Sequence, residues 1–247
     1  MTRGLLDNHM KPSATIDTSV CGNRQSISSV HRGFTFELKS LDQQERGCGL
    51  NSYPILGWLA EAREMRGHVL YDDGRRPLFR MNDGSFSDPD PVDIDAYHIL
   101  ARSEGHIVGY ARIVPPTSLL TGVIASAIGR CQFEAILHEL GTDRERICEA
   151  SRWAVVPECR GSLGLQIVVA SWIAARWLSY EKALVLAATC RKQDVALIRM
   201  GAHAVSSLPL FSWRFSDEQL RLLYFDAAHA SEFMEKKIAE LANAFGN

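Results

Sequence analysis

The chain has 247 residues, of which 46% are hydrophobic and 23% are charged, the composition of an ordinary globular protein of about one domain. Its 27 basic and 29 acidic residues give a formal net charge of −2, which excludes the basic excess that holds nucleic acid through its phosphates. Six cysteines, none in a Cys-x-x-Cys pair, are too few for a disulfide scaffold and predict no structural zinc site. No apolar stretch reaches the roughly 20 residues of a membrane span and no secretory signal is present, so we expect a cytoplasmic protein.

The chain divides into a polar start and one long domain. Residues 1–30 are rich in Ser, Thr, Asn, Gln and Gly and show no period, which predicts a flexible arm ahead of a domain over 31–247. Alternating phenylalanines predict a strand over 31–38, and apolar residues at helical spacing predict a helix over 55–70. The Asp-, Gly- and Pro-rich stretch 71–92 predicts a long loop of the kind that is usually functional.

The rest of the chain alternates strands and helices. Strands over 96–101 and 106–114 flank the turn Arg102-Ser-Glu-Gly105 and predict a hairpin. Residues 121–140 have a largely helical pattern, and 147–156 predict a strand that ends at Pro157. The remaining predicted elements are a helix from 164 to 180, a strand over 183–188, a helix over 192–200, a strand over 221–225 and a helix over 228–245.

Two charged residues, Glu149 and Arg152, interrupt the otherwise apolar strand 147–156. A buried ionised side chain must be paired or face a cavity, because an isolated buried charge is too costly. Residues three positions apart on a strand point to opposite faces, so these two need not pair with each other. The alternative is that each lies on the surface of an edge strand.

The strand is followed by a turn that contains Arg160, Gly161 and Gly164 and leads into a helix. Backbone N–H groups and the positive end of a helix favour a phosphate or pyrophosphate at such a place. Strand–glycine–helix turns are common in α/β proteins, so a purely structural turn is the alternative.

A Gly-x-x-Arg sequence on the second hairpin strand, followed by Glu-x-Ser-Arg-x-x-Val on the next long strand, resembles the acyl-homoserine-lactone (autoinducer) synthases and their sister N-acyl amino acid synthases. The residues that carry the resemblance are Gly109, Arg112, Glu149, Ser151, Arg152 and Val155, and it covers about residues 55–215. Both groups belong to the GNAT acyltransferase superfamily. The resemblance implies a single GNAT-like α/β domain with a mixed, mostly antiparallel central sheet, flanking helices and a V-shaped cleft between central strands.

The resemblance also implies roles for individual residues. Glu149 becomes the general base that takes the proton of the acceptor amine, directly or through a water, with Arg112 and Arg152 as the other catalytic residues. The implied substrate-binding residues are Arg66, Asp90, Asp93 and Ser151, and Asp88 and Asp95 are neighbouring acidic alternatives. The implied residues for the phosphopantetheine arm are Trp153, Val155, Arg160, Gly161 and Gly164.

We therefore expect an N-acyltransferase that moves an acyl group from an acyl carrier protein or CoA thioester to a small amine such as S-adenosylmethionine or an amino acid, with no tightly bound cofactor and no metal. Two departures affect this expectation. Leu70 stands where the autoinducer synthases usually have an aromatic residue, and Leu197–Gly201 lacks the tyrosine of many acetyltransferases. The alternatives are an N-acyl amino acid synthase or another biosynthetic GNAT acyltransferase, and a non-catalytic acyl- or CoA-binding regulatory module.

Three further side-chain predictions concern residues outside the motif. We expect His98 to be a hydrogen-bonded core or rim residue, because it lies on an apolar strand without ligand spacing. Trp172 and Trp177 are expected in the core. Arg75 and Arg76 are expected to be solvated.

Overall fold

A computed structural model describes residues 27–31, 33–41, 57–71, 74, 76–213 and 216–245. The expected arm lies outside the described residues up to position 26, and the positions that follow form strand β1 (Ile27–His31). Among the described residues no single helix is long and apolar enough to cross a membrane, although the bent pair Pro116–Ile128 and Arg130–Glu139 meets the length and composition criteria jointly.

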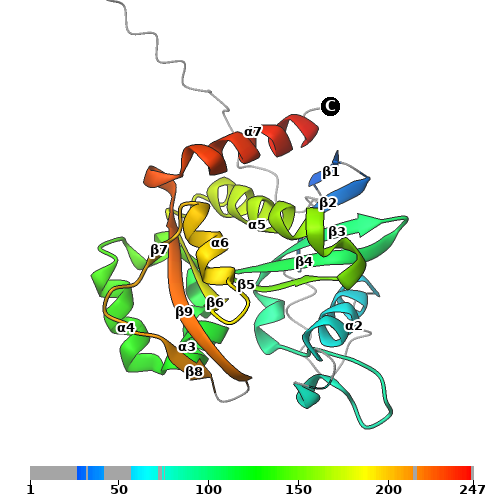
Figure 1. Cartoon of the computed structure of the whole chain (residues 1–247), viewed down its shortest axis with the longest axis horizontal. Coiled ribbons are helices and arrows are strands. Elements are labelled where there is room, and N and C mark those ends of the chain that lie inside the picture. The colour runs from blue at the N-terminus through cyan, green and yellow to red at the C-terminus, as the bar shows by residue number, and fades with distance from the viewer. Residues whose placement is uncertain are drawn as a thin grey trace, which may run out of the picture.

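The described strands form one sheet in the order β1-β2-β3-β4-β5-β6-β9-β7, with β8 paired to β9 (Figure 1). The other strands are β2 (Phe34–Ser40), β3 (Tyr97–Ser103), β4 (His106–Val114), β5 (Ile147–Val155), β6 (Lys182–Ala188), β7 (His203–Ala204), β8 (Phe211–Trp213) and β9 (Ser216–Asp226). Among the strands that the structure describes, only β5 and β6 pair in parallel. The mixed, mostly antiparallel sheet expected from the sequence is therefore confirmed.

Helices cover both faces of the sheet. They are α2 (Gly57–Tyr71), α3 (Val123–Ile128), α4 (Arg130–Glu139), α5 (Arg160–Trp177), α6 (Gln193–Arg199) and α7 (Glu232–Phe245). Side chains of α5, α6 and α7 share one core with β3 and β4 residues such as Ile99 and Ile113. Leu100 of β3 and Tyr110 of β4 point to the opposite face of the sheet and pack with α2. This alternation follows from the two-residue period of a strand. Figure 1 shows α7 lying beside α5, which is apolar on most sides because it lies between the sheet and α7.

The sheet splits between β5 and β6. These strands pair only from Ile147 with Lys182 to Glu149 with Leu184, although β5 continues to Val155 and β6 to Ala188. On its other side β5 carries a β-bulge, because two residues lie opposite Ala111 of β4 where the register shifts. One of them, Arg152, has φ +59°. The predicted V-shaped opening between central strands corresponds to this split.

Several boundaries differ from the predictions. A 3-10 turn (Pro157–Cys159) follows β5, and α5 begins at once at Arg160, so Gly161 and Gly164 lie inside the helix and not in a preceding loop. A Cβ on either glycine would meet nothing within 4 Å, so neither is required by close packing within the chain. Trp172 is buried as expected, but Trp177 is 45% exposed because it ends the helix at the surface.

The loop expected after the first helix folds back along α2. A Cβ on Gly67 of α2 would collide with the backbone of Ser87, so only glycine allows this approach. The contact places the N–H of Asp88 3.0 Å from the carbonyl oxygen of Arg63. The loop and the helix therefore act as one packed unit on the sheet.

Replacing Gly67 by alanine should lower the free energy of unfolding by about 1–3 kcal/mol, because backbone atoms cannot move aside as a flexible side chain can. Gly57→Ala is the matched control on the same helix, since a Cβ there meets nothing within 4 Å. It should leave stability unchanged or raise it slightly. Denaturant unfolding of both variants measures the difference, and equal stabilities would contradict this packing.

Candidate active site

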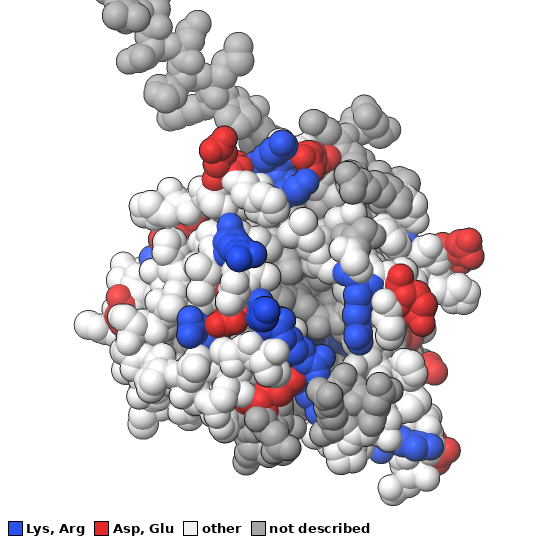
Figure 2. Space-filling model, viewed as in Figure 1, with Lys and Arg blue, Asp and Glu red and all other residues white. Residues whose placement is uncertain are grey.

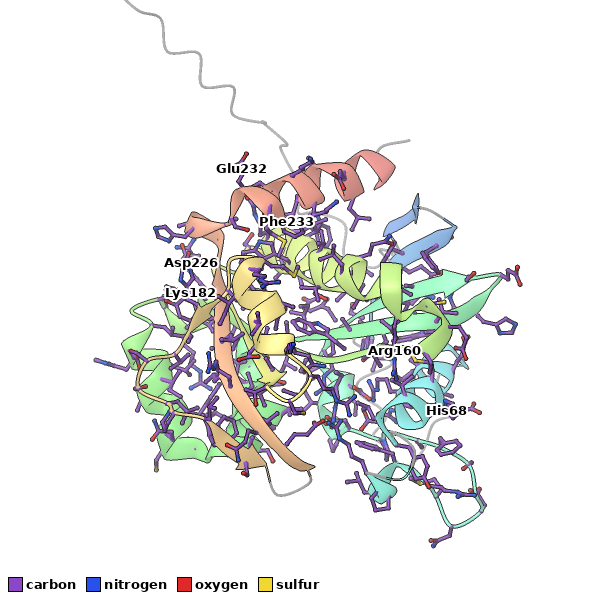
Figure 3. All side chains as sticks on the ribbon, viewed as in Figure 1. His68, Arg160, Lys182, Asp226, Glu232 and Phe233 are labelled. Atoms are coloured by element: carbon purple, nitrogen blue, oxygen red, sulfur yellow. The ribbon has the colours of Figure 1, made fainter. Side chains whose placement is uncertain are left out.

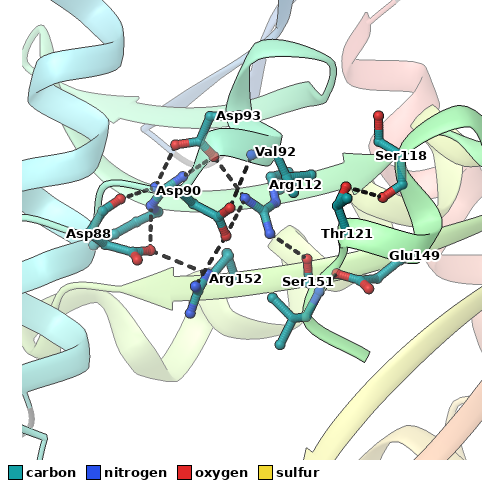
Figure 4. Close-up of polar contacts among 12 residues, drawn as sticks. Asp88, Asp90, Val92, Asp93, Arg112, Ser118, Thr121, Glu149, Ser151 and Arg152 are labelled. Atoms are coloured by element: carbon teal, nitrogen blue, oxygen red, sulfur yellow. Dashed lines mark hydrogen bonds and ion pairs between the residues drawn. The ribbon is translucent and has the colours of Figure 1, made fainter. Parts of the chain in front are cut away.

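The centre of the site is the carboxylate of Asp93, which has no exposed surface. Three guanidiniums donate hydrogen bonds to it: Arg63 at 2.9 Å, Arg66 at 2.8 Å and Arg112 at 2.9 Å. Burial alone would raise the pKa of Asp93, but the charges of Arg66 and Arg112 outweigh it and hold the pKa far below its ordinary value. Figure 4 shows this carboxylate between α2 and the sheet. We call these four side chains the Asp93 cluster.

Two further carboxylates extend the Asp93 cluster outward. Asp90 lies 2.9 Å from Arg112 and 3.2 Å from Arg152, and Asp88 lies 3.0 Å from Arg66 and 3.3 Å from Arg152. Although burial raises the pKa of Asp90, the charges of Arg112 and Arg152 lower it overall. Because arginines and carboxylates alternate, each charge in the cluster has partners of opposite sign, as buried charges require.

His98 and Tyr110 hold the Asp93 cluster from the side of the sheet. The Tyr110 hydroxyl accepts from Arg66 Nη1 at 2.6 Å and lies 2.7 Å from His98 Nδ1. His98 Nε2 lies 2.8 Å from the carbonyl oxygen of Asp93, so it must carry the proton and Nδ1 must accept from the tyrosine. The ring of Trp58 packs edge-on against His98 with centroids 5.0 Å apart. His98 is thus a fully hydrogen-bonded core residue, as predicted.

Glu149 lies apart from the Asp93 cluster, at the start of α3. It is fully buried, and its two oxygens accept from the backbone N–H groups of Val123 (3.2 Å) and Ile124 (3.0 Å). A Cβ on Gly122 would come within 2.5 Å of this carboxylate, so a larger residue there would displace the carboxylate. Both oxygens are therefore engaged in holding α3. The arrangement favours a positioning role for Glu149 over the direct proton transfer expected from the sequence.

A pocket of about 340 Å³ opens beside the outer carboxylates of the site. Its wall includes Asp88, Asp90 and Arg152, and the remaining lining residues are Arg76, Leu78, Phe79, Met81, Pro89, Pro91, Thr121, Gly122, Val123 and Ser126. We call it the acceptor pocket, after the acceptor amine that the motif resemblance implies. Of the predicted substrate-binding residues only Asp90 lines it, because Arg66 and Asp93 have no exposed surface and lie behind its wall.

The other predicted residues occupy β4, β5 and the start of α5. Ser151 accepts a long hydrogen bond of 3.5 Å from Arg112. Arg112 is buried and also pairs with Asp90, so it supports the pocket wall from behind. Asp95, an alternative acidic candidate, accepts from Ser118 at 2.9 Å and takes no part in the Asp93 cluster.

The predicted donor-binding residues follow the bulge of β5. Trp153 and Val155 are half-buried on the strand, and Arg160 is exposed at the start of α5, where its Nε lies 3.5 Å from the carbonyl oxygen of Val155 (Figure 3). The first turn of α5 has no side-chain cap and no acidic residue. The N–H of Arg160 donates to the carbonyl oxygen of Pro157, but the positive end of the helix and a nearby arginine suit an anion there. Figure 2 shows further basic side chains gathered around the middle of this face.

Two features of the site could not be expected from the motif. Arg63 joins Asp93, and its spacing of three from Arg66 is the only sequence signal that both lie on one helix face. Arg76 was expected to be solvated, but its side chain is only 19% exposed and lines the acceptor pocket, while Arg75 lies outside the described residues. Among the described residues, no three His, Cys, Asp or Glu side chains form a group that could hold a metal ion.

Comparison with known proteins agrees with this architecture. The model of the acetyltransferase (GNAT) domain matches residues 74–170. The fold is similar to that of BjaI, a CoA-dependent acyl-homoserine lactone synthase solved with SAM and isopentyl-CoA, with 19% identity, TM-score 0.53 and coverage of 76% of this chain and 82% of that one. It is also similar to TofI, solved with an inhibitor and MTA, with 17% identity, TM-score 0.52 and coverage of 73% and 90%. No curated protein sequence matches the chain significantly.

The split sheet has the fold of these structures, and the segment 74–170 matches the acetyltransferase (GNAT) domain. The fold of the chain is similar to that of the acyl-homoserine lactone synthases.

Replacing Asp93 by asparagine should strongly destabilise the fold, by about 3–5 kcal/mol, because three guanidiniums lose the charge that compensates them. Denaturant unfolding measures the loss. Asp143→Asn, at an exposed turn, is the control and should change stability by less than about 0.5 kcal/mol. A small effect of Asp93→Asn would mean that water or rearrangement compensates the arginines.

The stability of the protein should fall as the pH drops from about 6.5 to about 4. Burial lowers the pKa of His98 to about 4, whereas an unfolded histidine takes up its proton near pH 6.5. Protonation therefore favours the unfolded chain within this window. His98→Asn keeps an acceptor for Tyr110 but cannot titrate. Melting temperatures of both proteins at pH 7.5 and 4.5 test this, and an equal acid-induced drop would contradict it.

Proposed function

We propose that this protein is an N-acyltransferase that moves an acyl group from a CoA or acyl carrier protein thioester to the amine of a small amino-acid-derived acceptor, as an acyl-homoserine lactone synthase does. The observation that carries the proposal is the acceptor pocket, in which Asp88 and Asp90 lie beside Arg152 of the β5 bulge. An amine acceptor and a thioester donor would meet at that bulge.

The donor would lie along the split between β5 and β6. Its phosphates would meet the uncapped first turn of α5 with Gly161, Gly164 and Arg160, and its pantetheine arm would follow the backbone of Trp153 and Val155. Backbone N–H groups beside the bulge would stabilise the tetrahedral oxyanion. Holding both reactants together lowers the barrier without a covalent enzyme intermediate.

The acceptor amine would bind at Asp90, whose side chain is 12% exposed, beside Asp88, which is buried between Arg66 and Arg152. In this proposal Asp90 contacts the amine and Arg152 orients Asp90, while Glu149 fixes the wall at Gly122 and Val123. The cluster of Arg66, Asp93 and Arg112 keeps this wall rigid from behind. A rigid site is needed because small misplacements of reacting atoms are costly in rate.

Product analysis tests the proposal. The protein is incubated with acyl-CoA or acyl carrier thioesters and either S-adenosylmethionine or free amino acids, and the products are identified by mass spectrometry. An acylated lactone with methylthioadenosine supports the synthase reaction, and an N-acyl amino acid supports the alternative N-acyl amino acid synthase. No acylated amine from any combination would contradict both and favour a non-catalytic binding module.

Asp90→Asn should lower kcat/KM for the acceptor by on the order of 10- to 100-fold and leave the KM of the thioester unchanged, because a charge-assisted contact to the amine is lost. Asp83→Asn, on an exposed turn of the same segment, is the matched control. An Asp90→Asn effect on the thioester KM alone would place the acceptor elsewhere.

A further inference from the structure

Arg76 lies on the rim of the acceptor pocket, outside the Asp93 cluster. Its guanidinium crosses from the segment after α2 to β9, where Nη2 lies 2.6 Å from Oε2 of Glu218, 142 positions away in the sequence. The two side chains are only 19% and 13% exposed. Arg76 is therefore held in a defined place at the pocket, unlike a mobile surface arginine.

Glu218 also pairs with a second arginine. Arg191 Nε lies 2.8 Å from Oε1 of Glu218, so the two carboxylate oxygens serve two guanidiniums. Arg152, the other arginine of the pocket, pairs with both Asp88 and Asp90.

The lining of the acceptor pocket therefore includes two carboxylates, Asp88 and Asp90, and two guanidiniums, Arg76 and Arg152. Arginine carries five N–H donors in a planar fork, and the contact with Glu218 occupies only part of them. A carboxylate is the anion whose geometry that fork fits best. Arg152 is already held by two carboxylates, so the carboxylate of an acceptor would bind at Arg76 while its amine binds at Asp90.

We propose that Arg76 is a specificity-determining residue that receives the carboxylate of the acceptor, and that Glu218 is a positioning residue that orients it. This inference rests on the proposed function and adds to it the residue that would separate amino-acid-like acceptors from simple amines.

Paired ligands that differ only in the carboxylate test the inference. Calorimetry compares S-adenosylmethionine with decarboxylated S-adenosylmethionine, and methionine with methioninamide, on the full chain. Arg76→Gln should weaken binding of the carboxylate-bearing ligand by on the order of 10- to 100-fold and leave its partner unchanged. Arg76→Lys should weaken it less, because it keeps the charge but loses the fork. Glu218→Gln should also weaken it less, because only the orientation of Arg76 is lost.

Arg146→Gln is the matched control. Arg146 also joins the two halves of the sheet, through an ion pair of 2.7 Å with Glu181, but it lies at the paired ends of β5 and β6. It should not change the affinity for any of the four ligands. Weaker binding of S-adenosylmethionine by this variant would mean that removing a positive charge near the split lowers the affinity wherever the charge lies, which would contradict a specific contact at Arg76.

The outcomes separate this inference from the proposed function. If Arg76→Gln weakens both members of a pair equally, or neither, the inference is overturned, and acyl transfer by the unmodified protein still supports the proposed function. If the unmodified protein binds none of the four ligands, the proposed function is contradicted and the inference with it.

Discussion

The buried carboxylate of Asp93 and the three guanidiniums around it are the interaction on which the rest of the site depends. They join the helix α2, the loop after it and strand β4 through bonds between residues 19 to 30 positions apart in the sequence. A buried cluster of this kind adds little net stability compared with apolar packing, but removing one member leaves the others uncompensated. The arrangement therefore has one low-energy geometry. That geometry presents Asp88, Asp90 and Arg152 to the acceptor pocket.

The split sheet supplies the second half of the site. Because β5 and β6 separate after Glu149 and Leu184, the backbone of β5 beyond that point is not paired with β6. The bulge at Arg152 turns that side chain toward Asp90 of the pocket. The bulge also lies next to the stretch of β5 that is proposed to bind the donor. In the proposed function, one strand would serve the acceptor through its side chains and the donor through its backbone. Amide formation would need such an arrangement, since both reactants must meet at one point.

The sequence predicted the sheet, the hairpin and the main helices, because hydrophobic periods and turn residues are local signals. The motif also indicated Arg66, Asp93 and Arg112, which the structure brings together, but not that they lie behind the pocket wall. The bonds of Glu149 to α3 and of Arg76 to Glu218 had no local signal, since they join residues 25 and 142 positions apart. The start of α5 was placed too late because glycines, read as a turn, lie within its first turns.

A crystal structure of the protein with S-adenosylmethionine and a non-hydrolysable acyl-CoA analogue tests the central claim most directly. The account predicts the acceptor amine within hydrogen-bond distance of Asp90 and the analogue's carbonyl beside the backbone of β5 at Trp153, with the Asp93 cluster unchanged. An acceptor bound away from the pocket, or a cluster opened by the ligand, would contradict it.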